Sequence, residues 1–251
     1  MLSVADPHAT RRAAFRSLKE RLAAVQRPAP PLERRLPCEL PALDLALGGG
    51  LPIGLVTLEG AASSGRGAIA FRALAVASRS AFVALLDDGA CYPPALVEAG
   101  VLLERLLIVP VREGRLLARA LDTLLRSRVC RVVVVRARAW SAAIWGRFSQ
   151  LARETGSTLL TFLDEGVHAP AGLPALRLRC RNEGFVLCGR GSVGSAFLGY
   201  TFCVEPLART LPSRSPLSLQ AMRASERMVL RERALRSASA PQRAAQMQSA
   251  I

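Results

Sequence analysis

A short glycine-rich segment holds the residues of this sequence that are best suited to phosphate chemistry. Residues 60–67 read Gly-Ala-Ala-Ser-Ser-Gly-Arg-Gly. The spacing of the first two glycines matches the phosphate-binding pattern G-x-x-x-x-G-K-[ST]. In that pattern backbone N–H groups surround the phosphates, the Lys neutralises their charge and the hydroxyl holds Mg²⁺. We therefore expect a loop related to a nucleotide site, formed by Gly60, Ser63, Ser64, Gly65, Arg66 and Gly67.

The residue types within this segment argue against hydrolysis. Arg66 stands in the Lys position, and its planar guanidinium does not replace a compact ammonium on a flexible stem. Gly67 stands in the hydroxyl position and has no oxygen for a metal. The metal-holding Asp expected at the end of a hydrophobic strand is absent, because residues 132–135 are all Val and are followed by Arg136. We expect a degenerate nucleotide loop, with no catalytic residue, no metal and no cofactor.

A pair of neighbouring carboxylates keeps an enzymatic alternative open. Asp87 and Asp88 follow the apolar residues 82–86. In a divergent DNA-dependent ATPase, Asp88 would activate water, while Asp87 or Asp164 would hold the metal. The same Asp87-Asp88-Gly89 run also suits a simple turn that ends a strand.

Apolar runs and helical patterns alternate through the middle of the chain. The apolar and β-branched runs predict strands at residues 56–59, 82–86, 106–109, 132–135 and 158–163. Helical patterns lie between them, at residues 68–78, 93–99, 114–127 and 141–155. This alternation is typical of an α/β fold with a mainly parallel sheet and helices on both faces.

The pattern changes after residue 163. Residues 175–181 alternate apolar and basic side chains, and a second apolar run at 185–188 follows Asn182-Glu183-Gly184. We expect a hairpin that extends the sheet, with its arginine row on an edge open to solvent. This row could bind nucleic acid or could discourage aggregation of the edge. The candidate nucleic-acid-binding residues are Arg177, Arg179, Arg181 and Arg190.

The two ends of the chain differ in composition from its centre. Residues 1–27 contain an amphipathic helix whose apolar stripe could pack on the core or contact a partner chain, and residues 28–35 form a Pro-rich linker. The core spans residues 36–205. A basic tail occupies residues 206–251, and its segment 217–236 could form a helix when bound. The predicted partner-binding stripe consists of Phe15, Leu18, Leu22 and Val25.

The overall composition favours an acidic or nucleic-acid partner, although the arginine bias of the chain weakens this inference. The chain has 251 residues, with 34 basic and 19 acidic side chains, and its net charge is +15. Only Lys19 among the basic residues is Lys, a bias that a GC-rich coding sequence produces by itself. The six cysteines form no C-x-x-C pair and indicate free thiols rather than zinc. No signal segment or membrane span is recognisable, so we expect a cytoplasmic protein with no membrane contact.

The residues that precede the glycine-rich segment resemble those of a known family. Residues 36–54 read LPCELPALDLALGGGLPIG, which resembles the approach to the phosphate loop in RecA-type recombinases. Ser63-Ser64-Gly65 continues the likeness, and the order and spacing of elements match over residues 36–163, roughly half the chain. The resemblance implies a RecA-like fold.

The same resemblance places family roles on altered residues. The catalytic Glu of RecA-type ATPases falls on Asp88, counted back from Gly100-Val101. The Asn-Gln pair that senses the γ-phosphate falls on Asp164-Glu165, which would repel phosphate. Residues 136–141 are fewer than the first DNA-binding loop of RecA contains.

A RecA-like core of this size with a degenerate nucleotide site is similar to the ImuA family. Some relatives in that family carry the label of SulA-like division inhibitor. The resemblance implies an accessory protein of SOS-induced, error-prone translesion synthesis that contacts ImuB, with RecA and single-stranded DNA as further partners. Three readings follow: a non-hydrolysing adaptor, a divergent ATPase that uses Asp88, and a nonspecific DNA-binding protein.

Overall fold

The computed structural model describes residues 35–89, 91–137, 140–188, 196–207, 216–224 and 227–232. The predicted partner-binding stripe, Phe15, Leu18, Leu22 and Val25, lies outside these residues, as does Arg190.

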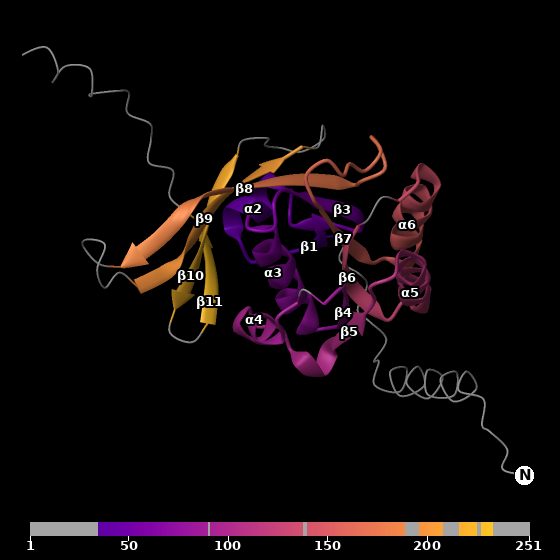
Figure 1. Ribbon diagram of the computed structural model, residues 1–251, viewed down its shortest axis with the longest axis horizontal. Coiled ribbons are helices and arrows are strands. Elements are labelled where there is room, and N and C mark those ends of the chain that lie inside the picture. Colours follow the sequence, from indigo (N-terminus) through magenta and orange to yellow (C-terminus); the bar gives the residue numbers. More distant parts are fainter. Residues whose placement is uncertain are drawn as a thin grey trace, which may run out of the picture.

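A nine-stranded sheet forms the centre of the molecule, with the order β11-β10-β9-β8-β3-β7-β6-β4-β5 (Figure 1). The strands from β8 to β5 in this order run parallel, and β9, β10 and β11 continue the sheet with antiparallel pairing. The parallel strands are β3 (Gly54–Glu59), β4 (Phe82–Asp87), β5 (Leu106–Pro110), β6 (Cys130–Arg136), β7 (Thr158–Leu163) and β8 (Leu176–Cys188). The antiparallel strands are β9 (Ala196–Pro206), β10 (Leu217–Ala224) and β11 (Arg227–Glu232). A separate pair consists of β1 (Arg35–Leu36) and β2 (Leu51–Pro52).

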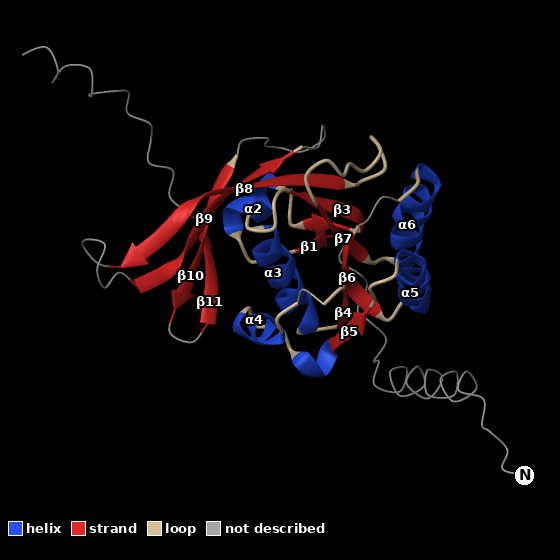
Figure 2. Cartoon of the chain, viewed as in Figure 1, coloured by secondary structure: helices blue, strands red, loops and turns tan. Residues whose placement is uncertain are grey.

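Helices cover both faces of the parallel part of the sheet, as predicted (Figure 2). One face carries α2 (Pro41–Ala46), α3 (Arg66–Ser78) and α4 (Pro93–Glu98), and η1 (Leu103–Arg105) precedes β5. The other face carries α5 (Gly114–Ser127) and α6 (Ala142–Thr155).

The four valines of β6 explain why the sheet needs helices on both faces. Val132 and Val134 pack into the core below α3, whereas Val133 and Val135 pack into the core below α5 and α6. Successive side chains of a strand point to opposite faces, so an unbroken apolar run can be buried only if both faces are covered. All four valines are fully buried.

The predicted turn at Asn182-Glu183-Gly184 is wrong. β8 runs unbroken through these residues and pairs with β9, with a register irregularity between Asn182 and Gly184. Gly184 has a φ of 147°, which lets the strand take up the irregularity as a bulge. Asn and Gly serve turns and bulges alike, so their presence alone did not distinguish the two. The expected open edge is also wrong, because β8 lies between β3 and β9.

The segment 217–236, which we expected could form a helix when bound, contains strands in this structure. β10 and β11 occupy residues 217–232 in part and pair with each other, and β10 also pairs with β9. Leu217 and Leu219 alternate with Ser218, a period-two pattern that suits a strand, and Leu219 is fully buried. Part of the segment predicted as a tail from residue 206 therefore belongs to the sheet.

The cysteines whose side chains are described are free thiols. Burial raises the pKa of Cys130 and of Cys180 to about 12, so both stay protonated at neutral pH. None of the helices in the described ranges combines the length and the apolar character needed to cross a bilayer.

Candidate functional site

The carboxyl ends of the parallel strands bring the predicted site residues to one edge of the sheet. β3 ends at Glu59 before the glycine-rich loop, β4 ends at Asp87, β6 ends at Arg136, and Asp164 follows β7. Ligands of open α/β sheets bind outside this edge, because the loops that follow the strands surround a crevice there. The structure thus assembles at one place residues that are up to about a hundred positions apart in the sequence.

The glycine-rich loop joins β3 to α3 at this edge. Gly65 precedes the first helical residue and has a left-handed backbone, with a φ of 89°. Within the loop, the Ser64 N–H donates to the Ala61 carbonyl oxygen over 3.0 Å. The first N–H groups of a helix have no acceptor inside the helix, so the start of α3 keeps the backbone donors of an anion-binding helix terminus.

Arg66 is directed to the end of β7 and its side chain is buried. Only 2% of the residue is exposed, and one guanidinium nitrogen donates to the Leu163 carbonyl oxygen over 2.8 Å. A second nitrogen forms an ion pair with the Asp164 carboxylate. The guanidinium carbon lies 5.3 Å from the centre of the Phe162 ring. The cation in the Lys position is therefore neutralised and held by the protein itself.

A cavity of about 410 Å³ adjoins the start of α3. Arg136 and Asp88 form an ion pair across 3.7 Å in this cavity, and Asp87 accepts a hydrogen bond of 3.0 Å from the Cys91 N–H. Its lining includes Arg66, Gly67, Asp87, Asp88, Arg136 and Phe162.

This donor set does not fit a magnesium ion. Mg²⁺ takes oxygen ligands, yet Gly67 supplies no hydroxyl and the Asp88 carboxylate is paired with the Arg136 guanidinium. The two guanidiniums that line the cavity match its two carboxylates, so the lining carries no excess negative charge to attract a cation. Among the described residues no group of three or more His, Cys, Asp or Glu side chains is placed to hold a metal.

The C-terminal strands close over the glycine-rich loop, a feature that sequence reasoning missed. An added Cβ at Gly65 would lie 2.2 Å from the Phe202 ring of β9. The Asn182 side-chain amide of β8 donates to the Ser63 carbonyl oxygen over 3.0 Å. These contacts join residues more than a hundred positions apart, and no local spacing signals them.

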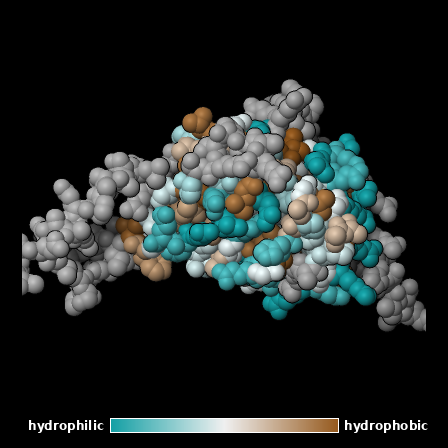
Figure 3. Space-filling view, turned by 90° about the horizontal axis from the view of Figure 1, so that it is seen from above, coloured by the Kyte–Doolittle hydropathy of each residue, from teal (hydrophilic) through white to brown (hydrophobic). Residues whose placement is uncertain are grey.

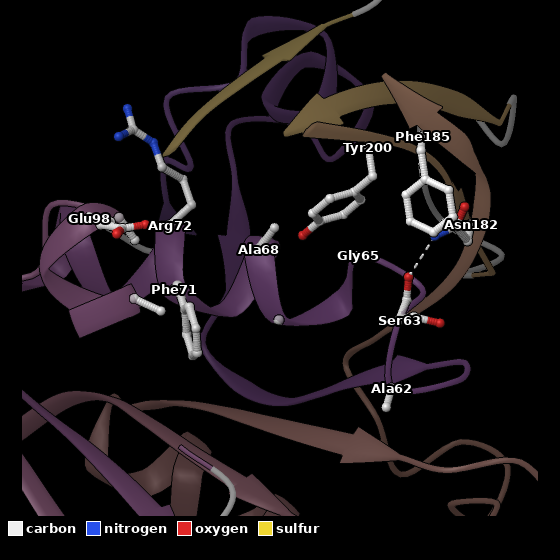
Figure 4. Close-up of a pocket in the computed structure, with 13 residues that line it drawn as sticks. Ala62, Ser63, Gly65, Ala68, Phe71, Arg72, Glu98, Asn182, Phe185 and Tyr200 are labelled. Atoms are coloured by element: carbon white, nitrogen blue, oxygen red, sulfur yellow. Dashed lines mark hydrogen bonds between the residues drawn. The ribbon is translucent and has the colours of Figure 1, made fainter. Parts of the chain in front are cut away.

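A second cavity, of about 320 Å³, lies between α3, α4 and the β8–β9 strands (Figure 4). Phe71 and Ala68 of α3 and Tyr200 of β9 give it a mainly apolar lining, and Asn182 and Ser63 meet at one side. Burial raises the pKa of Tyr200 above its usual value, and the neighbouring Cys180 adds to the rise. The cavity is thus shaped by the contact between the loop and the C-terminal strands.

The arginines of β8 are neutralised by carboxylates. Arg177 donates to Glu59 over 2.7 Å, and Glu205 lies 3.7 Å from Arg179 and 3.8 Å from Arg181. The predicted nucleic-acid-binding row is therefore brought together on one strand, but its charge is largely balanced.

Comparison with known proteins shows which fold this chain shares. The crystal structure of the RadB recombinase superposes with a TM-score of 0.58 at 17% identity, over 79% of this chain and 100% of that chain. The fold is RecA-like. In sequence, the RecA protein of Trichodesmium erythraeum (strain IMS101) is 38% identical over 96 residues, and so is RecA of Nostoc punctiforme (strain ATCC 29133 / PCC 73102).

The sequence match to RecA is local. It covers 37% of this chain and 27% of each of these two relatives, so the chain spans about a quarter of their length. No family model matches the chain. The superposition confirms the RecA-like fold that the resemblance implied.

Proposed function

We propose that this chain is a non-hydrolysing RecA-like adaptor of damage-induced translesion DNA synthesis. It acts through protein contacts with ImuB, and RecA or DNA are further partners. The RecA-like fold and the local likeness to RecA support a DNA-related role. The observation that carries the proposal is the position of Arg66, whose guanidinium donates to the Leu163 carbonyl oxygen and forms an ion pair with Asp164.

The physical argument concerns the charge available to a triphosphate. Phosphoryl transfer depends on a free cation and a metal that neutralise the transferred group. Arg66 is buried against Asp164, and Arg136 occupies the strand end where a metal-binding Asp belongs. A nucleotide at the loop would therefore find backbone N–H donors without the charges that promote cleavage.

The proposal predicts that the purified full chain turns over no Mg²⁺-ATP, with or without single-stranded DNA. The measurement is release of inorganic phosphate, with labelled ATP binding as a parallel readout. The Asp88→Asn variant is the key comparison, because a contaminating ATPase would act equally in both preparations. Turnover by the parent chain that vanishes in this variant would overthrow the proposal.

That outcome would establish the second candidate, a divergent ATPase in which Asp88 activates water. The observation in its favour is that Asp87 and Asp88 line the same cavity as Gly67. The ion pair of Asp88 with Arg136 opposes it, because it directs the carboxylate to a guanidinium rather than to a water molecule.

A further prediction concerns the partner contact at residues 1–27. Replacing Leu18 and Leu22 by Asp places charge on the predicted apolar stripe, so a pull-down of ImuB by the full chain should be abolished. The matched control is Ser17→Asp with Ala24→Asp, which adds the same charge on the other side of the predicted helix. Equal capture of ImuB by both variants would remove this stripe from the proposal.

A further inference from the structure

The outer surface of α5 carries a row of arginines opposite its buried stripe. Leu117, Leu121 and Leu125 recur every four residues and are buried on the side that faces the sheet. Arg115, Arg119 and Arg126 recur at spacings of four and seven and are exposed. The α-helical repeat places each set on its own face, so three guanidiniums line the solvent side of one helix.

α6 adds to this surface, which we call the α5–α6 face. The two helices together hold five arginines and two carboxylates. Seen from above, hydrophilic side chains gather on the α6 side of the molecule (Figure 3). The arginines of the face are Arg115, Arg119, Arg126, Arg147 and Arg153, with Arg128 next to the end of α5.

One carboxylate serves two of these arginines. Asp122 accepts from Arg126 over 3.0 Å and from Arg147 over 2.6 Å. Burial alone would raise the pKa of Asp122, but the two guanidiniums outweigh it and the pKa is lowered. The side chains of Arg115, Arg119 and Arg128 form no ion pair within the part of the chain that the structure describes. The α5–α6 face therefore keeps excess positive charge.

Local helix stability does not account for Arg115. It stands in the first turn of α5, where the positive end of the helix dipole disfavours a cation. A carboxylate at this position would be the stabilising choice. An unpaired cation in such a place is better explained by a ligand outside the chain.

The β8 row offers a direct contrast. Arg177, Arg179 and Arg181 are matched by Glu59 and Glu205. Carboxylates beside these guanidiniums would have to be displaced or would repel an approaching phosphate. Of the two arginine rows, the α5–α6 face is the one that keeps arginines without an ion pair among the described residues, namely Arg115 and Arg119.

We propose that the α5–α6 face binds the phosphate backbone of duplex DNA. From Arg115 to Arg126 the helix advances about 16 Å, a length over which a duplex presents about ten phosphate charges. Guanidinium matches phosphate oxygens in a bidentate fashion. α5 has no aromatic residue, and Trp145 and Phe148 of α6 are buried, so the described part of this face offers no platform for unpaired bases. The contact is therefore to the backbone and independent of sequence.

The choice of DNA as the polyanion rests on the proposed DNA-related role, whereas the test measures this surface alone. The full chain is titrated against a labelled 30-base-pair duplex of arbitrary sequence, and fluorescence anisotropy is followed at several salt concentrations. Arg115→Glu with Arg119→Glu should weaken binding about tenfold or more. The slope of log K against log salt should become less steep by about 1.8, because two phosphate contacts are lost.

The matched control is Arg179→Glu with Arg181→Glu, which makes the same charge change on β8. Thermal unfolding confirms that both variants are folded. Equal weakening of duplex binding by both pairs of substitutions would indicate an effect of net charge and would overturn the proposal. No weakening by the α5 pair would overturn it as well.

A labelled single strand of equal charge and a polyglutamate peptide test the other polyanions. If the α5 variant lost binding to the single strand or to polyglutamate but still bound the duplex, the proposal would also be overturned. ATP turnover and ImuB capture are read separately, so their outcomes do not depend on this one.

Discussion

Replacement of Gly65 by Ala is expected to lower the free energy of unfolding by about 3 kcal/mol, through overpacking and a left-handed backbone. The new Cβ would lie 2.2 Å from the Phe202 ring, and the backbone φ of 89° is unfavourable for Ala. Phe202 is fully buried, so its ring cannot swing away without opening the core. For a chain of this size the melting temperature should fall by about 6–12 °C.

The neighbouring glycine is a matched control for this prediction. An added Cβ at Gly67 would meet nothing within 4 Å, and Gly67 lies inside α3 with an ordinary helical backbone. Gly67→Ala should therefore be neutral or stabilise the chain by up to about 1 kcal/mol. Thermal or denaturant unfolding of both variants distinguishes the two sites. If both variants were equally stable, the close contact between Phe202 of β9 and Gly65 would be contradicted.

Replacement of Arg66 by Ala is expected to lower the free energy of unfolding by about 3 kcal/mol. The change removes a charge-assisted hydrogen bond to the buried Leu163 carbonyl and leaves a cavity where the guanidinium stem was packed. The free energy of unfolding of the Arg66→Lys variant should lie between those of the parent chain and of Arg66→Ala. An ammonium keeps the charge but cannot reproduce the planar contact with both Leu163 and Asp164. Denaturant unfolding at constant pH provides the measurement.

The control for Arg66 is another arginine that is paired with a carboxylate at the surface. The Arg79 side chain is 52% exposed and its pair with Glu39 is solvated, so Arg79→Ala should cost less than about 1 kcal/mol. Addition of Mg²⁺-ATP gives a second readout, because a ligand that binds the folded chain raises its stability. If ATP stabilised the parent chain strongly and Arg66→Lys even more, Arg66 would be a nucleotide-binding residue rather than a structural one.

Hydrophobic periodicity was sufficient to predict the strands β3 to β7 and the helices α3 to α6, whereas α2 and the β1–β2 pair were not predicted. The run of valines at 132–135 lies within β6, and the apolar stripe of residues 114–127 coincides with α5. These elements depend on patterns of a few residues, which the sequence displays directly. The same reasoning failed at residues 182–184, which lie in β8 and pair with β9, and at residues 217–224 and 227–232, where β10 pairs with β9 and β11 pairs with β10.

The candidate site was predictable in its chemistry and unpredictable in its contacts. The types of residue at positions 66, 67 and 136 follow from the sequence alone, and no fold can give Gly67 a hydroxyl. The partners of Arg66 lie 97 and 98 positions away, and the sequence contains no signal that selects them. Contacts of this range are set by strand order and by which rotamers the packed core permits.

The charge of the chain could be predicted from the sequence, but the pairing of individual charges could not. The sequence by itself determined that this chain is strongly basic and that its glycine-rich loop has Arg66 and Gly67 in place of the Lys and the hydroxyl residue of the phosphate-binding pattern. Only the tertiary structure decided which guanidiniums are neutralised, because it places Glu59 and Glu205 beside β8 and leaves Arg115 and Arg119 of α5 without a carboxylate among the described residues. The physical reason is that Coulomb interaction depends on distance in space, which residue order does not specify.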